Sequence, residues 1–305
     1  MIDPVIFTIK IGGFELPLYW YAVLFVFGIV VGTWLAAREV RRRGGDASLV
    51  WDGLAWVAPA GIIGARLWYV ATDILGGSAR YLENPISILN TKEGGLHYYG
   101  GLLFGAIAVY FYVRKHKMDM WRLIDSSAAS LLIGQAVARP GNFINQELYG
   151  QPTELPWGIP ISAANRRAPW NDLTLFPEET TRFHPAFAYE MILNFVAGGL
   201  LLWLGRRFPK KMKPGALFAA WLILAGVGRE LIEFFRPDQP RVPSTDISYS
   251  RIVAGLMIIA GVVWLLIRYE VIRLPFISPG PESYAAAPPT PSAEAEEQET
   301  NEGAV

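Results

Sequence analysis

The run LYWYAVLFVFGIVVGTWLAA, residues 18–37, contains no charged side chain and decides the fold class. A helix needs about 20 predominantly apolar residues to cross the roughly 30 Å hydrocarbon core of a bilayer. Further apolar stretches of comparable length lie at about 50–74, 96–113, 123–138, 186–205, 215–233 and 250–269. The sequence therefore predicts an all-α polytopic membrane protein with about seven transmembrane helices.

The composition agrees with this prediction and also indicates an orientation. Of the 305 residues, 52% are hydrophobic, and the 27 basic and 27 acidic residues cancel in the net charge. The basic residues nevertheless gather in alternate connections, at Arg38, Arg41, Arg42 and Arg43, at Arg114, Lys115, Lys117 and Arg122, and at Arg206, Arg207, Lys210, Lys211 and Lys213. Short loops rich in Lys and Arg remain cytoplasmic. We therefore expect the N-terminus outside, the C-terminus in the cytoplasm, and an extracytoplasmic loop region between spans 4 and 5.

The two ends of the chain differ from its apolar body. Residues 1–17 lack the basic segment of a cleavable signal peptide, so we expect a short amphipathic segment on the outer surface. From about residue 275 the sequence is rich in Pro, Ala and Glu, which cannot bury enough apolar surface to offset chain entropy. The predicted division is an integral-membrane domain, residues 1–274, and a disordered cytoplasmic tail, residues 275–305.

Cysteine is absent from the sequence. The chain therefore has no disulfide, no thiolate metal ligand and no thiol nucleophile of its own. With His97, His116 and His184 as its only histidines, it is also a poor candidate for a multi-histidine metal site. We expect neither a metal nor a cofactor, and no nucleic-acid partner.

One polar stretch stands out in this apolar chain: residues 138–150 read ARPGNFINQELYG. Pro140 and Gly141 should interrupt the fourth span, and broken backbone at membrane depth is tolerated where it lines a cavity or is buried in protein. The guanidinium group of Arg139 and the amide groups of Asn142 and Asn145 are donors that could bind a phosphate group. A lipid-phosphate site and a polar gate are equally good interpretations. The polar side chains concerned are Arg139, Asn142, Asn145 and Glu147.

Other polar groups near the spans allow two interpretations each. Tyr21, in LYWYAV, could belong to an interfacial aromatic belt or face a ligand. Arg66, in GIIGARLWYV, could pair with an acid on another helix or bind a ligand. Arg229 and Glu233 are four residues apart, so they share a helical face and could form a stabilising pair or part of a site.

The stretch ARPGNFINQELYGQPTELPWG closely resembles the signature of bacterial prolipoprotein diacylglyceryl transferases. The resemblance extends through DPVIF, LYWYAV, GARLWYV, HPAFAYE and GRELIEFFRPD, in the same order, and only the acidic tail lies outside it. It implies an enzyme that moves the diacylglyceryl group of phosphatidylglycerol to the lipobox cysteine thiol of a preprolipoprotein signal peptide. A thioether forms and glycerol phosphate leaves. Such an enzyme is expected as a monomer in the bacterial plasma (inner) membrane.

The resemblance also implies roles for individual residues. Arg139 and Arg229 would clamp the lipid phosphate, and Glu147 and Glu233 would orient those arginines or the glycerol hydroxyls. The remaining lipid-binding positions would be Tyr21, Arg66, Asn142, Asn145 and Gly150, where Gly150 lets the backbone turn close to the ligand. The motif HPAFAYE would position the extracytoplasmic segment through His184, Tyr189 and Glu190.

Two positions depart from the family pattern. The family usually has His directly before the Gly-Gly of the third span, as a base for the thiol, but GGLHYYGGL has Tyr99 there and His97 two residues earlier. Either residue could serve, or no strong base is required, because a thiol with a pKa of about 8.5 is partly ionised anyway. Ala225 stands where the family commonly has Tyr.

These departures leave room for a second hypothesis, a catalytically weak or silent relative that binds phospholipid or lipoprotein precursors. A solute transporter is disfavoured because the sequence shows no internal repeat.

Overall fold

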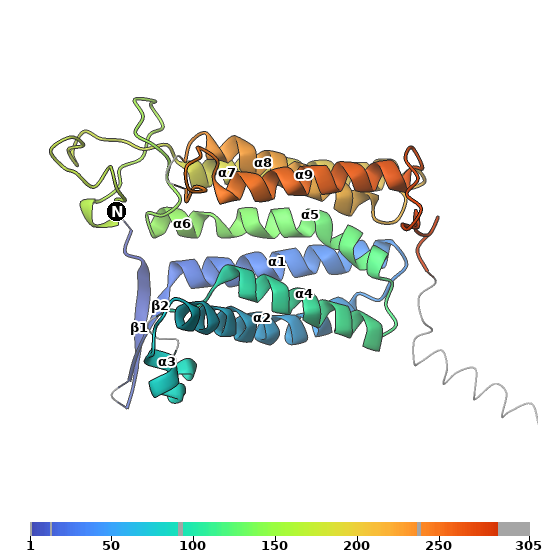
Figure 1. Cartoon of the computed structure of the whole chain (residues 1–305), viewed down its shortest axis with the longest axis horizontal. Helices are drawn as coiled ribbons and strands as arrows, with labels where there is room; N and C mark the ends of the chain where they lie inside the picture. The colour runs from blue at the N-terminus through green and yellow to red at the C-terminus, as the bar shows by residue number, and fades with distance from the viewer. Residues whose placement is uncertain (1, 13, 91–93, 237–238, 286–305) are drawn as a thin grey trace, which may run out of the picture. The chain divides into compact units, whose positions relative to one another are not determined.

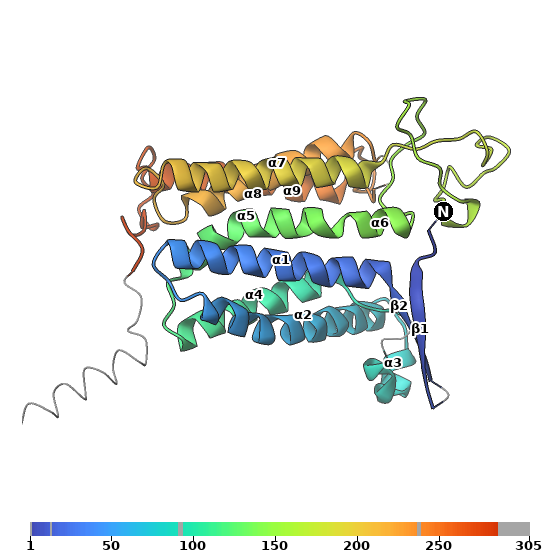
Figure 2. The ribbon, with the colours of Figure 1, turned by 180° about the vertical axis from the view of Figure 1, so that it is seen from behind.

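The computed structural model describes residues 2–12, 14–90, 94–236 and 239–285, and most of them are helical (Figures 1 and 2). Each of the seven apolar stretches forms a helix, which agrees with the prediction of a mainly helical protein. Their bounds are Trp20–Arg42 (α1), Ser48–Leu75 (α2), Tyr98–Lys115 (α4), Met120–Ala138 (α5), Ala186–Arg207 (α7), Ala216–Glu233 (α8) and Tyr249–Arg268 (α9). Shorter helical turns are Arg80–Glu83 (α3), Pro85–Leu89 (η1), Pro140–Ile144 (α6) and Ala163–Asn165 (η2).

Within the described residues, four helices are long and apolar enough to cross a membrane: α1, α2, α7 and α9. The other three long helices, α4, α5 and α8, fall outside this group. Helix α8 contains Arg229, Glu230 and Glu233, and α5 contains Arg122 and Asp125. The structure therefore supports a helical membrane protein.

The N-terminal segment is a β-hairpin, so the prediction of an all-α chain is wrong there. Strands β1 (Val5–Ile11) and β2 (Phe14–Tyr19) pair antiparallel, with Phe7 opposite Leu18 and Ile9 opposite Leu16. Apolar and polar residues alternate from Phe7 to Ile11 and from Phe14 to Leu16, and this period of two is typical of a strand. Helix α1 begins directly after β2.

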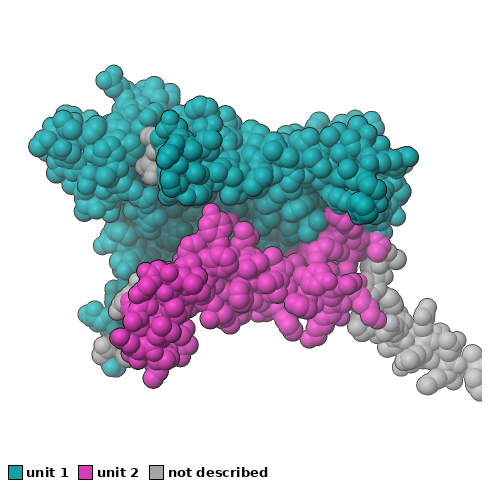
Figure 3. Space-filling view, in the orientation of Figure 1, with its two compact units in different colours: residues 1–39, 124–284 teal, residues 40–123, 285–305 magenta. Residues whose placement is uncertain are grey.

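The chain forms two compact units, drawn in different colours in Figure 3. Unit 1 comprises residues 1–39 and 124–284, and unit 2 comprises residues 40–123 and 285–305. In unit 1, α1 and α5 approach so closely that a Cβ atom added to Gly28 would lie 2.5 Å from the Gly134 carbonyl oxygen. In unit 2, α2 packs on α4, where a Cβ added to Gly64 would lie 2.3 Å from the Phe104 Cβ. Small residues thus permit close helix packing in both units.

A buried carboxylate fixes one end of α8 in unit 1. Asp125 is 2% exposed, and its carboxylate accepts hydrogen bonds from the backbone N–H groups of Gly215 (2.6 Å) and Phe218 (2.8 Å). These two donors belong to the first turn of the helix, which has no intrahelical acceptors for them. The Tyr284 hydroxyl donates a third hydrogen bond to Asp125, at 2.8 Å. Asp125 is therefore the cap of α8.

The chain beyond α9 contacts the same end of unit 1. Lys213 pairs with Glu282 at 2.8 Å, and the fully buried Arg268 donates to the Pro281 carbonyl at 2.7 Å. Residues 286–305, which make up most of the predicted disordered tail, lie outside the described residues. The division into a domain of residues 1–274 and a tail of residues 275–305 stays a prediction.

Candidate active site

The helix break predicted at Pro140 is present. Helix α5 ends at Ala138, and the short α6 begins at Pro140, with Arg139 between them. Proline fits the first position of a helix, because its missing N–H would have no intrahelical acceptor there. The backbone then turns back, since the Glu147 N–H donates to the Asn142 carbonyl at 2.8 Å. The break therefore gathers the polar side chains of residues 139–147 within one turn region.

The guanidinium group of Arg139 is held from two directions. Its Nη2 pairs with Glu190 Oε1 of α7 at 2.5 Å, and its Nη1 donates to Asn142 Oδ1 at 3.4 Å. Its Nε has no hydrogen-bond partner among the described residues, although the atom is buried. Both charged side chains are about four-fifths buried, at 21% and 18% exposed. The Nε donor of Arg139 is thus unused in a largely desolvated place, where an anion would be bound strongly.

The carboxylate that orients Arg139 is not the one expected from the sequence. Glu147 instead accepts a hydrogen bond from Asn145 Nδ2 at 2.8 Å. Glu190 was expected to position the extracytoplasmic segment, but it is the ion-pair partner of Arg139. No spacing rule could identify this pair, because the two residues are 51 positions apart.

Tyr21 lies against the helix break. A Cβ atom added to Gly141 would meet Tyr21 Cδ2 at 3.0 Å and Tyr21 Cα at 3.2 Å. The first turn of α1 therefore packs directly on the first turn of α6, and the absence of a side chain at Gly141 permits this contact. Tyr21 is half-buried here, and its place in a lipid site stays a prediction.

The second arginine expected in the site, Arg229 of α8, has its own set of partners. Its Nη2 lies 3.5 Å from Glu233 Oε2, so the predicted pair one helical turn apart is confirmed. The same atom donates to Gln239 Oε1 at 2.8 Å, and Nε donates to the Ser250 hydroxyl. Gln239 and Ser250 were not identified from the sequence, because single neutral polar residues carry no spacing signal. These contacts fix the guanidinium plane of Arg229.

A chain of three side chains joins the segment after α6 to the start of α7. The Trp157 indole donates to the Tyr189 hydroxyl at 2.7 Å, and this hydroxyl lies 3.0 Å from His184 Nδ1. Indole N–H is only a donor, so the Tyr189 proton is directed to His184, which acts as acceptor at Nδ1. Burial lowers the pKa of His184 below its ordinary value, which favours this neutral tautomer at neutral pH. His184 and Tyr189 are thus linked to Trp157 by hydrogen bonds, and their role in positioning this segment stays a prediction.

Gly150 makes a close backbone approach to two other segments of the protein. A Cβ atom added there would lie 2.4 Å from the Phe235 carbonyl oxygen and 2.9 Å from the His184 Cβ. The Gly150 N–H also donates to the His184 carbonyl at 2.8 Å. The structure thus gives Gly150 a packing role between the segments around His184 and Phe235.

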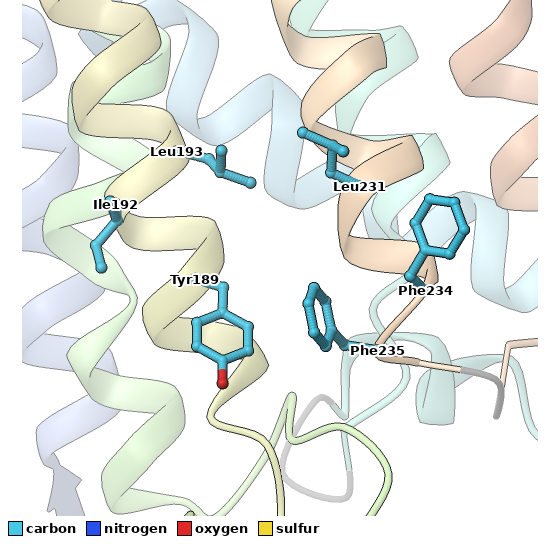
Figure 4. Close-up of a pocket in the computed structure, with 6 residues that line it drawn as sticks. All are labelled: Tyr189, Ile192, Leu193, Leu231, Phe234 and Phe235. Carbon is cyan, nitrogen blue, oxygen red and sulfur yellow. The ribbon is translucent and has the colours of Figure 1, made fainter. Parts of the chain in front are cut away.

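An apolar groove of about 430 Å³ runs between α7 and α8 (Figure 4). Tyr189 and Phe235 lie at one end of it and Leu193 and Leu231 at the other. Its full lining is Tyr189, Ile192, Leu193, Leu231, Phe234 and Phe235. Tyr189 precedes Glu190 in the sequence, so the groove begins next to the residue that pairs with Arg139.

His97 and Tyr99 belong to unit 2 and lie beside one another. Their ring centroids are 5.5 Å apart, and the His97 ring also contacts Trp68 at 6.3 Å. The His97 N–H donates to the Ala65 carbonyl at 2.9 Å, which fixes the backbone before α4. His97 Nδ1 is buried without a hydrogen-bond partner among the described residues, whereas Tyr99 is half exposed. His97 therefore has a nitrogen without a hydrogen-bond partner. Whether His97, Tyr99 or neither residue is the base for the thiol stays a prediction.

Arg66, the remaining residue predicted to bind the lipid, forms hydrogen bonds with backbone carbonyl groups. Its guanidinium group donates to five carbonyl oxygens at 2.7–3.2 Å, those of Ser87, Ile88, Asn90, Gly94 and Gly95. A guanidinium group has five N–H donors, and the five contacts engage all three of its nitrogens. The structure favours the structural interpretation of Arg66, with carbonyl groups in place of the expected acid.

Replacing Arg66 is therefore expected to destabilise unit 2. A lysine at this position offers three donors from one atom and cannot reach carbonyls on several sides. We expect Arg66→Lys to lower the apparent unfolding temperature in detergent by several degrees, nearly as much as Arg66→Ala. Thermal unfolding followed by tryptophan fluorescence checks this. The exposed Arg80 of the same unit is the control, and equal shifts for Arg80→Ala and Arg66→Ala would contradict the assignment.

The comparisons with known proteins agree with these features. Residues 4–267 match the sequence model of a family described as prolipoprotein diacylglyceryl transferase. Relatives named phosphatidylglycerol–prolipoprotein diacylglyceryl transferase come from several bacteria. The Chloroflexus aggregans protein is 35% identical over 243 residues, which cover 77% of this chain and 78% of that protein. The Leifsonia xyli protein is 35% identical, covering 92% and 83%, and the Enterococcus faecalis protein 36%, covering 84% and 88%. The chain therefore belongs to the prolipoprotein diacylglyceryl transferase family.

Proposed function

We propose that this protein transfers the diacylglyceryl group of phosphatidylglycerol to the lipobox cysteine thiol of preprolipoproteins. A carbon–sulfur bond forms at the glycerol carbon of the diacylglyceryl group, and the bond from that carbon to the phosphate oxygen breaks. Glycerol phosphate leaves with the bonding electrons, and the thiol proton passes to a base or to water. The names of the relatives support this reaction, and the chain supplies no thiol of its own.

The observation that carries the proposal is the environment of Arg139. The leaving phosphodiester becomes a phosphomonoester, so negative charge grows on its oxygens as the reaction proceeds. Preorganised cations in a poorly solvated site lower the barrier for such a step. Glu190 and Asn142 hold the Arg139 guanidinium in place, and its Nε remains free to donate to the phosphate.

The other site residues receive roles in the same reaction. Arg229, fixed by Glu233, Gln239 and Ser250, is a second cation for the phosphate. Asn142, Asn145 and Glu147 bind the glycerol hydroxyls and phosphate oxygens, and Tyr21 lies beside the head group. These assignments stay proposals until each side chain has been replaced.

The helices are proposed to span the bacterial plasma membrane seven times, as α1, α2, α4, α5, α7, α8 and α9. The Arg- and Lys-rich ends of α1, α4 and α7 would face the cytoplasm, which places the N-terminus and the segment after α6 outside. Both substrates are embedded in the membrane, so they would enter sideways between helices. The apolar groove between α7 and α8 fits such a lateral route for a monomer.

The base for the thiol can be identified by its pH dependence. If His97 accepts the proton, His97→Ala should lower the transfer rate and change its dependence on pH, whereas Tyr99→Phe should leave both unchanged. If Tyr99 acts, the reverse holds. Rates of both variants from pH 5.5 to pH 9 distinguish these cases. A lipobox thiol that ionises unaided would leave the profile of both variants like that of the unmodified protein.

The proposed function is tested with purified protein, phosphatidylglycerol and a synthetic peptide containing a lipobox cysteine. A mass increase by one diacylglyceryl group on that peptide establishes the activity, and the same peptide with Ser in place of Cys is the control. Bound phosphatidylglycerol without any adduct would instead support the second hypothesis, a silent relative. The departures at Tyr99 and Ala225 are what keep this hypothesis under test, although the names of the relatives do not favour it.

A further inference from the structure

The N-terminal hairpin has two faces of opposite character. Cross-strand partners point to the same side of a sheet, so the pairs Phe7–Leu18 and Ile9–Leu16 form one face. The pairs Thr8–Pro17 and Lys10–Glu15 form the other face, where Lys10 and Glu15 are joined by an ion pair of 2.7 Å. One face is thus entirely apolar, and the other carries both charges of the paired region.

The apolar face is not covered by the other described residues of unit 1. Phe7 is 51% exposed and Leu16 is 66% exposed, although large aliphatic and aromatic side chains are costly to leave in water. A two-stranded hairpin is at best marginally stable in water and needs packing on a further surface. An exposed apolar patch of this kind marks a surface that contacts a membrane or another protein.

The connection to α1 decides between these two partners. Strand β2 ends at Tyr19 and α1 begins at Trp20, with no linker, and the Trp20 N–H donates to the Pro4 carbonyl at 3.0 Å. Helix α1 is long and apolar enough to span a membrane, and its basic residues, Arg38, Arg41 and Arg42, lie toward the opposite end. The hairpin is therefore fixed where α1 leaves the hydrocarbon. Tyr19 and Trp20 are both exposed at this junction, as aromatic residues at a membrane interface are.

We infer that the hairpin is an interfacial anchor that lies on the lipid surface with the Phe7–Leu16 face toward the acyl chains. The charged Lys10–Glu15 face is then turned to water. This arrangement matches that of amphipathic segments that bind membranes in the plane of the interface. It removes the exposed apolar area from water and fixes the N-terminal end of α1 at a defined depth. The inference is independent of the transfer reaction.

The absence of cysteine makes a direct test possible, because single cysteine variants of the full chain carry one label each. Leu16→Cys places a nitroxide label on the apolar face, and Thr8→Cys is the matched control on the polar face. The proteins are reconstituted in vesicles of phosphatidylcholine and phosphatidylglycerol. Power saturation by electron paramagnetic resonance then measures the collision of each label with oxygen, which enters lipid, and with a water-soluble nickel chelate.

We expect the oxygen-to-nickel ratio to be at least about 3-fold higher at position 16 than at position 8. A second pair of variants tests whether the apolar face is responsible. In the Leu16→Cys protein, Ile9→Glu should lower this ratio, whereas Thr8→Glu should not. Equal ratios at the two positions would overturn the inference. So would a label at position 16 that neither reagent reaches, or one that is shielded only when the lipobox peptide is added, because protein would then cover the face.

Discussion

Arg139→Ala is expected to lower the rate of diacylglyceryl transfer by about 10²–10³-fold, the typical loss when one preorganised donor to a developing negative charge is removed. The structure gives the reason: Arg139 is held by Glu190 at 2.5 Å and keeps its buried Nε free. Initial rates with phosphatidylglycerol and a lipobox peptide, measured by mass spectrometry, check this. Arg167→Ala, which removes an exposed arginine after α6, is the control and should retain activity.

Glu190→Gln keeps the charged Arg139 and removes the ion pair that orients it, so this variant measures how much the orientation contributes. The amide can still accept a hydrogen bond from Arg139, but it no longer holds the guanidinium by charge. We expect a smaller loss of rate than in Arg139→Ala, and little further loss when the two changes are combined, because they act through one side chain. If the fold-loss of rate in the double variant equalled the product of the two single fold-losses, Glu190 would act independently of Arg139. Unchanged turnover in Arg139→Ala would refute the phosphate assignment itself.

Asp125→Ala is expected to cause the largest loss of stability. It leaves the Gly215 and Phe218 N–H groups without their acceptor, and caps of this kind contribute about 0.5–2 kcal/mol each, more when the donor is left buried and unsatisfied. The expected loss is about 2–4 kcal/mol in total. Denaturation of the detergent-solubilised protein, followed by circular dichroism, measures it.

Two further variants interpret that measurement. Tyr284→Phe removes the third hydrogen bond to Asp125 and leaves the cap of α8 intact, so its effect should be clearly smaller. Asp172→Ala removes an exposed aspartate whose contacts are with Thr174, and it should hardly change stability. If Asp125→Ala behaved like Asp172→Ala, the capping role would be wrong.

The helices were predictable because each long apolar run is itself the signal. The stretch 50–74 corresponds to α2 at 48–75, and 186–205 corresponds to α7 at 186–207. The hairpin was missed because strands of seven and six residues give only a brief alternation, which resembles any amphipathic segment. Membrane helices are thus far easier to read from sequence than the short elements that join them.

The candidate site divides in the same way. The pair Arg229–Glu233 follows from helical spacing, and the break at Pro140 follows from the chemistry of proline. The partner of Arg139 could not be predicted, because the contact with Glu190 depends on how α7 packs and not on local sequence. For the same reason Arg66 was expected to meet an acid or a ligand, whereas the fold brings backbone carbonyls to it.

The five carbonyl bonds of Arg66 have a consequence for how the segment between α3 and α4 can vary. A carbonyl oxygen is common to all twenty amino acids, so the contacts of Ser87, Ile88 and Asn90 with Arg66 do not depend on the identity of those three side chains. Substitutions across the exposed residues of 84–90 should therefore be tolerated, whereas one side chain outside the segment is indispensable. A loop organised in this way can acquire a new surface, by evolution or by design, without losing its conformation.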